Sequence, residues 1–228
     1  MKLTKKIKNK IHHLYKLHVK KEKFLVEVHR WFKDKGDMTL RLDYPLTPSS
    51  VVFDLGGYHG DFAADIHEKY GCTVYIFEPV SEFFQICVDR FKGNGKIHCF
   101  KYGLSATDTW MDIGLAENAS SFQSPHTSGK MERVEIRSII PCIRELGVDS
   151  IDLMKINIEG GEFEVLDAMI DSNYTDNITN LQIQFHNFVE NAEEKRNALR
   201  KKLNSTHIET WNYEFVWENW KIKDTQSQ

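Results

Sequence analysis

The segment Val51-Val-Phe-Asp-Leu-Gly-Gly-Tyr-His-Gly60 carries the strongest structural signal in this chain. Its first five residues form a short apolar run that ends directly in glycines, a pattern typical of a strand buried in a parallel sheet. The glycines permit a tight turn, and the pattern at 61–70 is helical. We therefore expect a strand, a turn and a helix here, which together begin a β-α-β unit.

The same alternation of strand and helix recurs along the rest of the chain. Further strands are expected at 72–77, 97–100, 151–156 and 181–185, and further helices at 80–91, 138–147, 161–171 and 190–203. Residues 106–136 lack helical periodicity, which favours short strands and loops, and the aromatic tail 207–222 alternates like a β-hairpin. The sequence thus predicts an α/β fold: a mostly parallel seven-stranded sheet, helices on both faces and a C-terminal antiparallel hairpin.

Charge is distributed unevenly along the 228 residues, although the formal net charge is only −3. Residues 1–41 contain 13 Lys/Arg and 4 Asp/Glu, whereas residues 42–228 contain 17 Lys/Arg and 29 Asp/Glu. Apolar residues recur at three- and four-residue steps through 3–32, so an amphipathic helix is expected there. We predict two parts, a basic helical segment at 1–41 and an acidic α/β domain at 42–228.

The sequence also bears on the compartment. No run of about 18 apolar residues occurs, so no membrane-spanning helix is expected, and the N-terminus lacks the apolar stretch of a signal peptide. The four cysteines lie far apart in apolar contexts without a C-x-x-C pair: Cys72, Cys87, Cys99 and Cys142. Reduced, buried thiols in a cytoplasmic protein are the expected state.

The spacing of the glycines separates several kinds of nucleotide site. Dinucleotide binding through G-x-G-x-x-G needs a glycine where Tyr58 stands, and no G-K-[ST] motif of a nucleoside-triphosphate loop is present. The D-x-G-x-x-x-G pattern that starts at Asp54 instead resembles the first motif of S-adenosylmethionine (AdoMet) methyltransferases. This resemblance implies that Gly56, Gly57, Tyr58 and Gly60 line the cofactor. An ordinary strand-to-helix turn is the alternative.

Glu78 adds a second signal for a nucleoside cofactor. It ends the next predicted strand, in Tyr75-Ile-Phe-Glu-Pro79. A carboxylate at this place in an α/β fold can accept hydrogen bonds from both hydroxyls of a ribose. A surface carboxylate at a strand end is the alternative. The loop and the carboxylate together favour AdoMet as the cofactor, held by Asp54, the glycine loop and Glu78.

A longer motif lies at Ile151-Asp-Leu-Met-Lys-Ile-Asn-Ile-Glu-Gly-Gly-Glu162. It resembles the D-x-x-K-I-D-x-E-G-x-E signature of the FkbM family of AdoMet-dependent O-methyltransferases, and Phe77-Glu-Pro79 and Tyr102-Gly-Leu-Ser105 follow that family's order and spacing. The resemblance implies a Rossmann-like class I methyltransferase domain at 42–228. It also adds Pro79, Gly103 and Leu104 to the cofactor site.

The resemblance further implies a reaction. The expected function is methyl transfer to a hydroxyl of a sugar in a surface polysaccharide or a lipid-linked glycan, as part of polysaccharide biosynthesis. One alternative is an O-methyltransferase of a small secondary metabolite, and another is a non-catalytic module that keeps the AdoMet fold. A nicotinamide oxidoreductase is disfavoured by Tyr58.

Polar residues that follow two predicted strands are the candidates for catalysis. His186 follows the strand at 181–185, and the ordinary pKa of histidine near 6.5 suits proton abstraction from a hydroxyl. Glu159 and Asn157 follow the strand at 151–156. Asn157 stands where the family usually has Asp, so it can orient a group but cannot be the base. We predict His186, Glu159 and Asn157 as catalytic residues, with a structural role as the alternative for His186.

Acceptor binding is assigned to Glu162 and to three residues of the irregular insertion: Asn118, Ser120 and Ser121. Helix capping is the alternative for Glu162, and a plain surface loop is the alternative for the insertion. Asn157, Glu159, Glu162 and His186 could also ligate a divalent cation, because oxygen and imidazole ligands suit magnesium or manganese. A metal is not favoured.

The basic segment 1–41 has three interpretations. It packs on the body with solvated lysines, or attaches peripherally to anionic lipid at the inner face of the cell membrane, or contacts nucleic acid. Nucleic acid is not favoured, because the body is acidic and no nucleic-acid motif accompanies the lysines. The expected partner is a glycan or glycolipid acceptor, and membrane contact through the basic helix stays an open alternative.

Overall fold

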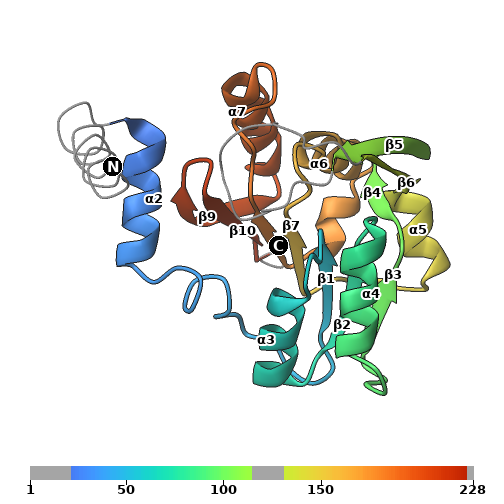
Figure 1. Ribbon diagram of the computed structural model, residues 1–228. Coiled ribbons are helices and arrows are strands. Elements are labelled where there is room, and N and C mark those ends of the chain that lie inside the picture. The colour runs from blue at the N-terminus through green and yellow to red at the C-terminus, as the bar shows by residue number, and fades with distance from the viewer. Residues whose placement is uncertain (1–21, 115–130, 225–228) are drawn as a thin grey trace, which may run out of the picture.

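The computed structural model describes residues 22–114 and 131–224. Its centre is a seven-stranded sheet in the order β3-β2-β1-β7-β8-β10-β9 (Figure 1). The strands from β3 to β8 are parallel, β10 runs antiparallel to β8, and β9 runs antiparallel to β10. The predicted α/β fold, with its mostly parallel seven-stranded sheet and C-terminal antiparallel hairpin, is confirmed.

The elements of this sheet follow the predicted alternation closely. The strands are β1 (Val51–Leu55), β2 (Thr73–Phe77), β3 (Ile97–Phe100), β7 (Leu153–Ile156), β8 (Asn180–Ile183), β9 (His207–Tyr213) and β10 (Trp217–Ile222). The helices are α2 (Lys23–Lys33), α3 (Asp61–Tyr70), α4 (Ser81–Arg90), α5 (Ile139–Glu145), α6 (Glu162–Asp171), α7 (Ala192–Leu203) and the short 3₁₀ helix η1 (Tyr174–Asn177). The bounds of the predicted elements differ from these by two residues or fewer, and η1 was not predicted. Of the helix predicted at 3–32, α2 covers residues 23–32, and residues 3–21 lie outside the described part.

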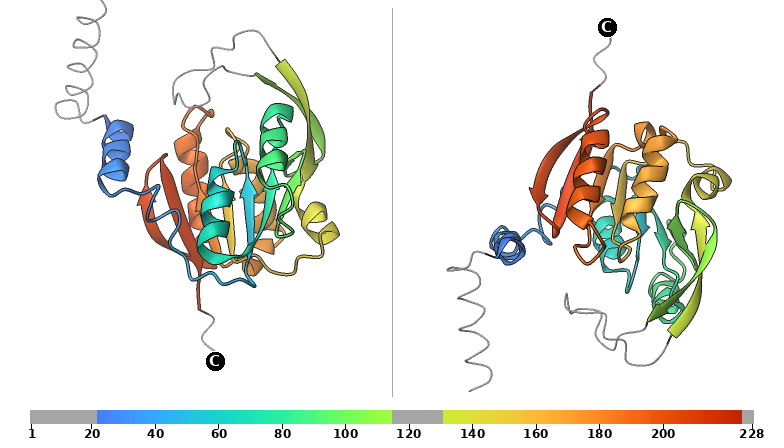
Figure 2. Two further views of the ribbon diagram at one scale, coloured as in Figure 1. Left: turned by 60° about the horizontal axis from the view of Figure 1, so that its bottom comes forward. Right: turned by 90° about the horizontal axis from the view of Figure 1, so that it is seen from above.

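Alternation along each strand builds two cores, one on each face of the sheet. Phe53 and Leu55 of β1 face the larger core, which contains side chains of α5, α6 and α7. Val52 faces the smaller core with α3 and with Cys87 of α4. Because side chains of a strand point alternately to opposite faces, Asp54 shares the face of Val52. Helices therefore cover both faces, as the sequence predicted (Figure 2).

The C-terminal hairpin supplies the surface on which α2 lies. Trp31 of α2 is 2% exposed and packs on Trp211 and Tyr213, at ring-centroid distances of 5.8 and 5.1 Å. The turn that the sequence left undefined is centred on Phe215, which has a positive φ of 58°. The tryptophans of the hairpin are thus largely packing residues. The predicted boundary at residue 41 stays a prediction.

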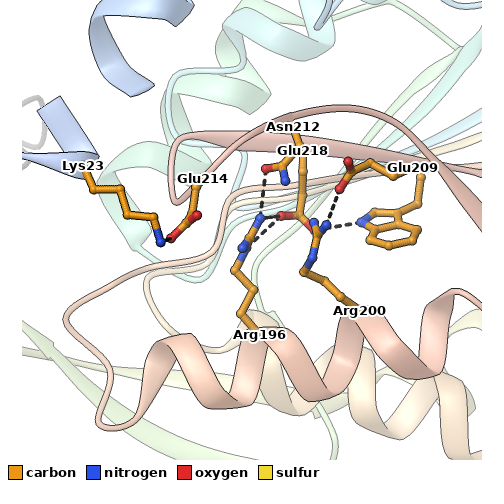
Figure 3. A network of polar contacts seen from close by, with 8 residues as sticks. Lys23, Arg196, Arg200, Glu209, Asn212, Glu214 and Glu218 are labelled. Carbon is orange, nitrogen blue, oxygen red and sulfur yellow. Dashed lines mark hydrogen bonds and ion pairs between the residues drawn. The ribbon is translucent and has the colours of Figure 1, made fainter. Parts of the chain in front are cut away.

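Ion pairs fix α7 to the same hairpin (Figure 3). The buried carboxylate of Glu218 on β10 accepts hydrogen bonds from Arg196 and Arg200 of α7, and Arg196 also donates to Asn212 at 2.9 Å. The indole of Trp220 donates to the same carboxylate at 2.7 Å. The set of Arg196, Arg200, Asn212, Glu218 and Trp220 is called the hairpin network below.

A second, three-stranded sheet lies on the side of the molecule away from the hairpin (Figure 2). It contains β4 (Gly103–Ser105), β5 (Thr109–Gly114) and β6 (Met131–Ser138), with β6 parallel to β4 and antiparallel to β5. The prediction of short strands within 106–136 is confirmed for the described residues. The pairing of β4 with β6 was not predicted.

Candidate active site

The glycine loop turns sharply at the carboxyl end of β1. Gly56 and Gly60 have φ values of 82° and 76°, and Tyr58 between them has a φ of 50°. The amide of Gly56 donates to the carbonyl of Phe77 at 3.0 Å, which ties the loop to the end of β2. The loop backbone is therefore held at the edge where ligands of open α/β sheets bind.

Two glycines of the loop are required by close contacts within the protein. A Cβ on Gly56 would lie 1.9 Å from the carbonyl oxygen of Asn157, and one on Gly57 would lie 2.2 Å from a methyl group of Ile76. These clashes are with the protein itself. Glycine is needed here because the backbone that follows β7 and a side chain of β2 approach the loop closely, whether or not a ligand is bound.

A buried ion pair lies directly beneath the loop. Nζ of Lys155 on β7 donates to Asp54 Oδ1 at 2.8 Å and to the carbonyl of Gly56 at 2.7 Å. The side chains are 4% and 0% exposed. Burial lowers the pKa of the Lys155 ammonium, and the charge of Asp54 opposes that shift. Lys155 thus fixes both the carboxylate and the backbone of the loop.

Sequence reasoning assigned no role to Lys155. The available signal was a lysine in the middle of the apolar run Leu153-Met-Lys-Ile156, since a buried lysine needs a partner. The same pair leaves a polar atom open: Oδ2 of Asp54 is buried and has no hydrogen-bond partner within the described residues. Such an atom is an acceptor ready for a cationic or N–H group.

Glu78 lies at the end of β2 beside the loop, as predicted. Its Oε2 accepts a hydrogen bond from the amide of Tyr58 at 2.8 Å, and its Oε1 accepts one from the amide of Val80 at 2.9 Å. Burial raises the pKa of this carboxyl group to about 6, against the effect of the two amides. Each oxygen keeps one lone pair, so the group can still accept two hydroxyl protons.

A second buried carboxylate, Glu162 at the start of α6, holds His186. Oε1 of Glu162 accepts from the backbone amide of His186 at 2.7 Å and faces Nδ1 at 3.1 Å. Oε2 accepts from the amide of Gly160 at 2.8 Å. Because an ionised carboxylate can only accept hydrogen bonds, Nδ1 carries the hydrogen in this contact. Nε2 of a neutral imidazole then has the free lone pair. Glu162 thus orients His186. Through the amide of Gly160 it also holds the turn before α6, a local structural role of the kind that the capping alternative assigned to it.

Glu159 and Asn157 lie on either side of the same arrangement. Glu159 has a φ of 51°, and its 81%-exposed side chain places Oε2 3.8 Å from Nε2 of His186. Burial lowers the pKa of His186, but the hydrogen bond and charge of Glu162 and the charge of Glu159 raise it overall. The amide of Asn157 donates to the carbonyl of Leu55 at 3.1 Å, so Asn157 joins the glycine loop to this turn.

The remaining predicted residues fall in four places. Pro79 follows Glu78, whereas Gly103 and Leu104 belong to β4, and the side chain of Leu104 is in the larger core. The ring of Tyr58 stacks on His59 at 3.7 Å. Asn118, Ser120 and Ser121 lie outside the described residues.

Three further features bear on the expectations. All four cysteines are free, and burial raises the pKa of each thiol, to about 12 for Cys87. Within 22–114 and 131–224, His, Cys, Asp and Glu side chains form no group of three or more that could hold a metal ion. No helix in these described ranges combines the length and the apolarity needed to cross a bilayer.

The family model for the methyltransferase FkbM domain matches residues 54–215. The chain belongs to the FkbM methyltransferase family. This confirms the resemblance seen in the sequence, and AdoMet is the cofactor, as expected. A search of curated proteins found no match to this chain.

Solved structures support the fold of this FkbM domain. A presumed rRNA methylase from Clostridium thermocellum superposes with a TM-score of 0.51 at 9% identity, covering 84% of this chain and 94% of that one. A presumed tRNA methyltransferase of Streptococcus pneumoniae, in complex with AdoMet, gives 0.47 at 12% identity and covers 83% and 73%. The N-terminal domain of human METTL16, in complex with S-adenosylhomocysteine, gives 0.44 at 12% and covers 88% and 71%. The first of these places the chain among Rossmann-like methyltransferase folds.

The residues of the loop fit AdoMet. The open acceptor on Asp54 suits an ammonium group, and the two free lone pairs on Glu78 suit a pair of ribose hydroxyls. Both carboxylates lie at the carboxyl ends of adjacent strands, on the two sides of the glycine loop. The loop therefore offers matching groups for the two polar parts of the cofactor.

We predict that Lys155→Met lowers the free energy of unfolding by about 3–5 kcal/mol, because it leaves the carboxylate of Asp54 buried without its partner. Urea denaturation followed by tryptophan fluorescence measures the loss. The double variant Asp54→Asn/Lys155→Met is expected to regain part of it. Lys69→Met, which removes an exposed lysine paired with Asp43, is the control and should change little. An unchanged midpoint for Lys155→Met would contradict the role assigned to the pair.

Proposed function

We propose that this protein is an AdoMet-dependent O-methyltransferase that acts on a sugar hydroxyl of a surface polysaccharide or a lipid-linked glycan. The observation that carries the proposal is the pair of His186 and Glu162 at the carboxyl-end edge of the sheet, in which Nδ1 lies 3.1 Å from the buried carboxylate and Nε2 is left to accept a proton. The turn that contains Glu159 connects this pair to the glycine loop through Asn157. A base thus lies at the same edge as the cofactor loop.

The reaction assigns a distinct task to each residue of this edge. AdoMet supplies a methyl group carried on a positively charged sulfur. A sugar hydroxyl is a weak acid, so its oxygen attacks more readily as its proton passes to Nε2 of His186. Glu162 stabilises the imidazolium that results, and Glu159 adds a second negative charge 3.8 Å from Nε2. In this proposal Glu162 is a positioning residue that orients the base.

The charge around the base supports a glycan acceptor over a nucleic acid. Glu159 and Glu162 adjoin His186, and Glu190, Glu193 and Glu194 follow within the next eight residues. Nucleic-acid sites instead gather lysine and arginine to neutralise phosphates. The neighbours described as RNA methylases share the fold with this chain at 9–12% identity. Identity this low gives no information about the substrate. The intact His186–Glu162 pair also speaks against a non-catalytic module.

We propose further that the enzyme works in the cytoplasm and binds the inner face of the membrane through its basic N-terminal segment. Residues 1–21 contain eight lysines, and the exposed side chains of Phe32 and Met38 lie in the same basic part of the chain. Lysines attract anionic lipid headgroups, and exposed apolar side chains can enter the interface. Trp31 packs on the hairpin, so a chain that lacks residues 1–21 keeps this contact.

The membrane proposal predicts that the full chain sediments with vesicles containing anionic phosphatidylglycerol and that the Δ1–21 chain binds them much more weakly. Vesicles of neutral phosphatidylcholine are the control, and neither chain should bind them. Salt should release the full chain, because electrostatic attraction between charges is screened. Equal binding of both chains to anionic vesicles would contradict the role of the basic segment.

The cofactor site predicts that Glu78→Gln weakens S-adenosylhomocysteine binding tenfold or more, because charged hydrogen bonds to the ribose become neutral ones. Isothermal titration calorimetry measures the change. The affinity of the unmodified protein should fall as the pH drops below about 6, since Glu78 then takes up a proton and loses an acceptor. Glu82→Gln, at an exposed position of α4, is the control. A Glu78→Gln protein with full affinity and the original pH dependence would refute the assignment.

The base predicts a specific titration. Burial lowers the pKa of His186, but Glu162 and Glu159 raise it overall, so the imidazole should lose its proton with a midpoint above pH 6.5, and kcat/KM should rise with pH through that midpoint. Glu159→Gln removes one of the two charges and should move the midpoint to lower pH. The imidazole resonance in NMR spectra, assigned with His186→Gln, reports this without an acceptor. Glu82→Gln again serves as the control. A midpoint at or below 6.5, or one that Glu159→Gln leaves in place, would exclude this arrangement.

A further inference from the structure

A cavity of about 580 Å³ lies beside the proposed base, between the β8–α7 connection, the first turns of α7 and the hairpin turn. The polar residues that line it are Asn187, Asn191, Asn197, Glu193 and Glu194, and Phe215 supplies an aromatic wall. Because α7 follows the parallel strand β8, its first turn lies at the carboxyl-end edge of the sheet. The cavity therefore opens on the same edge as His186.

The chain between His186 and α7 joins the cavity to the base. Asn187, the next residue after His186, lines the cavity. Phe188 is 62% exposed, and its ring centroid lies 5.2 Å from that of His186. A Cβ on Gly160 would lie 3.0 Å from Val189, so this connection packs closely on the turn that carries Glu159. An acceptor in the cavity would thus lie against the residue that directly follows the base, on a connection that also carries an exposed aromatic ring.

The chemistry of the lining selects among acceptors. Three amide side chains each offer a donor and an acceptor, which matches the hydroxyl groups of a sugar ring. Glu193 and Glu194 accept hydrogen bonds only and carry negative charge, and among residues 22–114 and 131–224 no lysine or arginine lines the cavity. Lys23 lies 3.8 Å from Glu193 but pairs more closely with Glu214 at 2.7 Å (Figure 3), and the guanidinium of Arg196, near Phe215, is already bound to the buried Glu218. A phosphate or carboxylate would meet like charge without a partner.

The wall of the cavity is held rigid by the hairpin network (Figure 3). Arg196 lies on α7 between Glu194 and Asn197 and bonds the buried Glu218 of β10. Its guanidinium also lies 5.4 Å from the ring centroid of Phe215. The backbone of α7, which carries the amides and carboxylates, is therefore held against the hairpin and the aromatic wall before an acceptor arrives, which lowers the entropic cost of binding.

We infer that this cavity is the acceptor site and that it selects a neutral or amino-bearing sugar segment and rejects a phosphorylated or carboxylated one. The inference rests on the proposed function and names the substrate class of that site. If the acceptor is lipid-linked, its phosphate lies away from the ring that is methylated.

Three tetrasaccharides of matched length test the inference: N-acetylchitotetraose, which is neutral, its de-N-acetylated form, which carries ammonium groups, and tetragalacturonate, which carries carboxylates. Calorimetry on protein saturated with S-adenosylhomocysteine should show binding of the first two and at least tenfold weaker binding of the third. The neutral probe should shift the side-chain amide resonances of Asn187, Asn191 and Asn197 in NMR spectra.

Variants separate the cavity from general attraction to an acidic protein. Glu193→Gln/Glu194→Gln should weaken binding of the ammonium-bearing tetrasaccharide about fivefold and leave binding of the neutral one unchanged. Asn197→Ala should weaken both probes. Glu68→Gln, at an exposed position of α3 away from the cavity, is the matched control and should alter neither.

The outcomes distinguish the inference from the proposed function. Failure of all three probes to bind, equal binding of tetragalacturonate, or resonance shifts away from the three asparagines would each overturn the inference. In those cases S-adenosylhomocysteine binding leaves the methyltransferase proposal standing. Failure of the unmodified protein to bind S-adenosylhomocysteine would overturn the proposed function itself.

Discussion

The buried ion pair between Lys155 and Asp54 is the interaction on which the edge of this sheet depends. It joins the two central strands, β1 and β7, and the same ammonium holds the carbonyl of Gly56. A buried charge without its partner costs several kcal/mol, so the two strands and the loop form a single electrostatic unit. Oδ2 of Asp54 is left unpaired by this arrangement and becomes the open acceptor of the loop. Structural and functional demands therefore meet in one carboxylate.

Glu162, at the start of α6, is a second buried carboxylate that holds several segments together, here the ends of β7 and β8. Its carboxylate is fully buried and accepts three N–H groups, two from His186 and one from Gly160. One negative charge thus fixes the turn after β7, the backbone after β8 and the tautomer of the imidazole together. The glycine-loop side and the His186 side of the edge are each organised by a buried carboxylate, and Asn157 links them through the backbone.

Sequence patterns predicted the main sheet well, because period-two alternation and apolar runs report burial directly. The β4–β6 pairing escaped prediction, since three residues such as Gly103–Ser105 are too few to show a period. The candidate site was predicted as a set of residues at strand ends, which the topology brings to one edge. The pairing of the charged residues was not predicted, because the partners lie far apart in the chain. Lys155 and Asp54 are separated by 101 residues, and Glu162 and His186 by 24.

The position of β10 in the sheet has a consequence for how the chain folds. β10 is the last strand in the sequence, yet it lies inside the sheet between β8 and β9. Trp31, near the other end of the described chain, packs on Trp211, Tyr213 and Trp217. During synthesis, α2 therefore leaves the ribosome long before its packing partner exists, and β8 keeps an open edge until residue 222 has emerged. We therefore expect α2 and the C-terminal hairpin to pack together only after the central strands of the sheet have been translated.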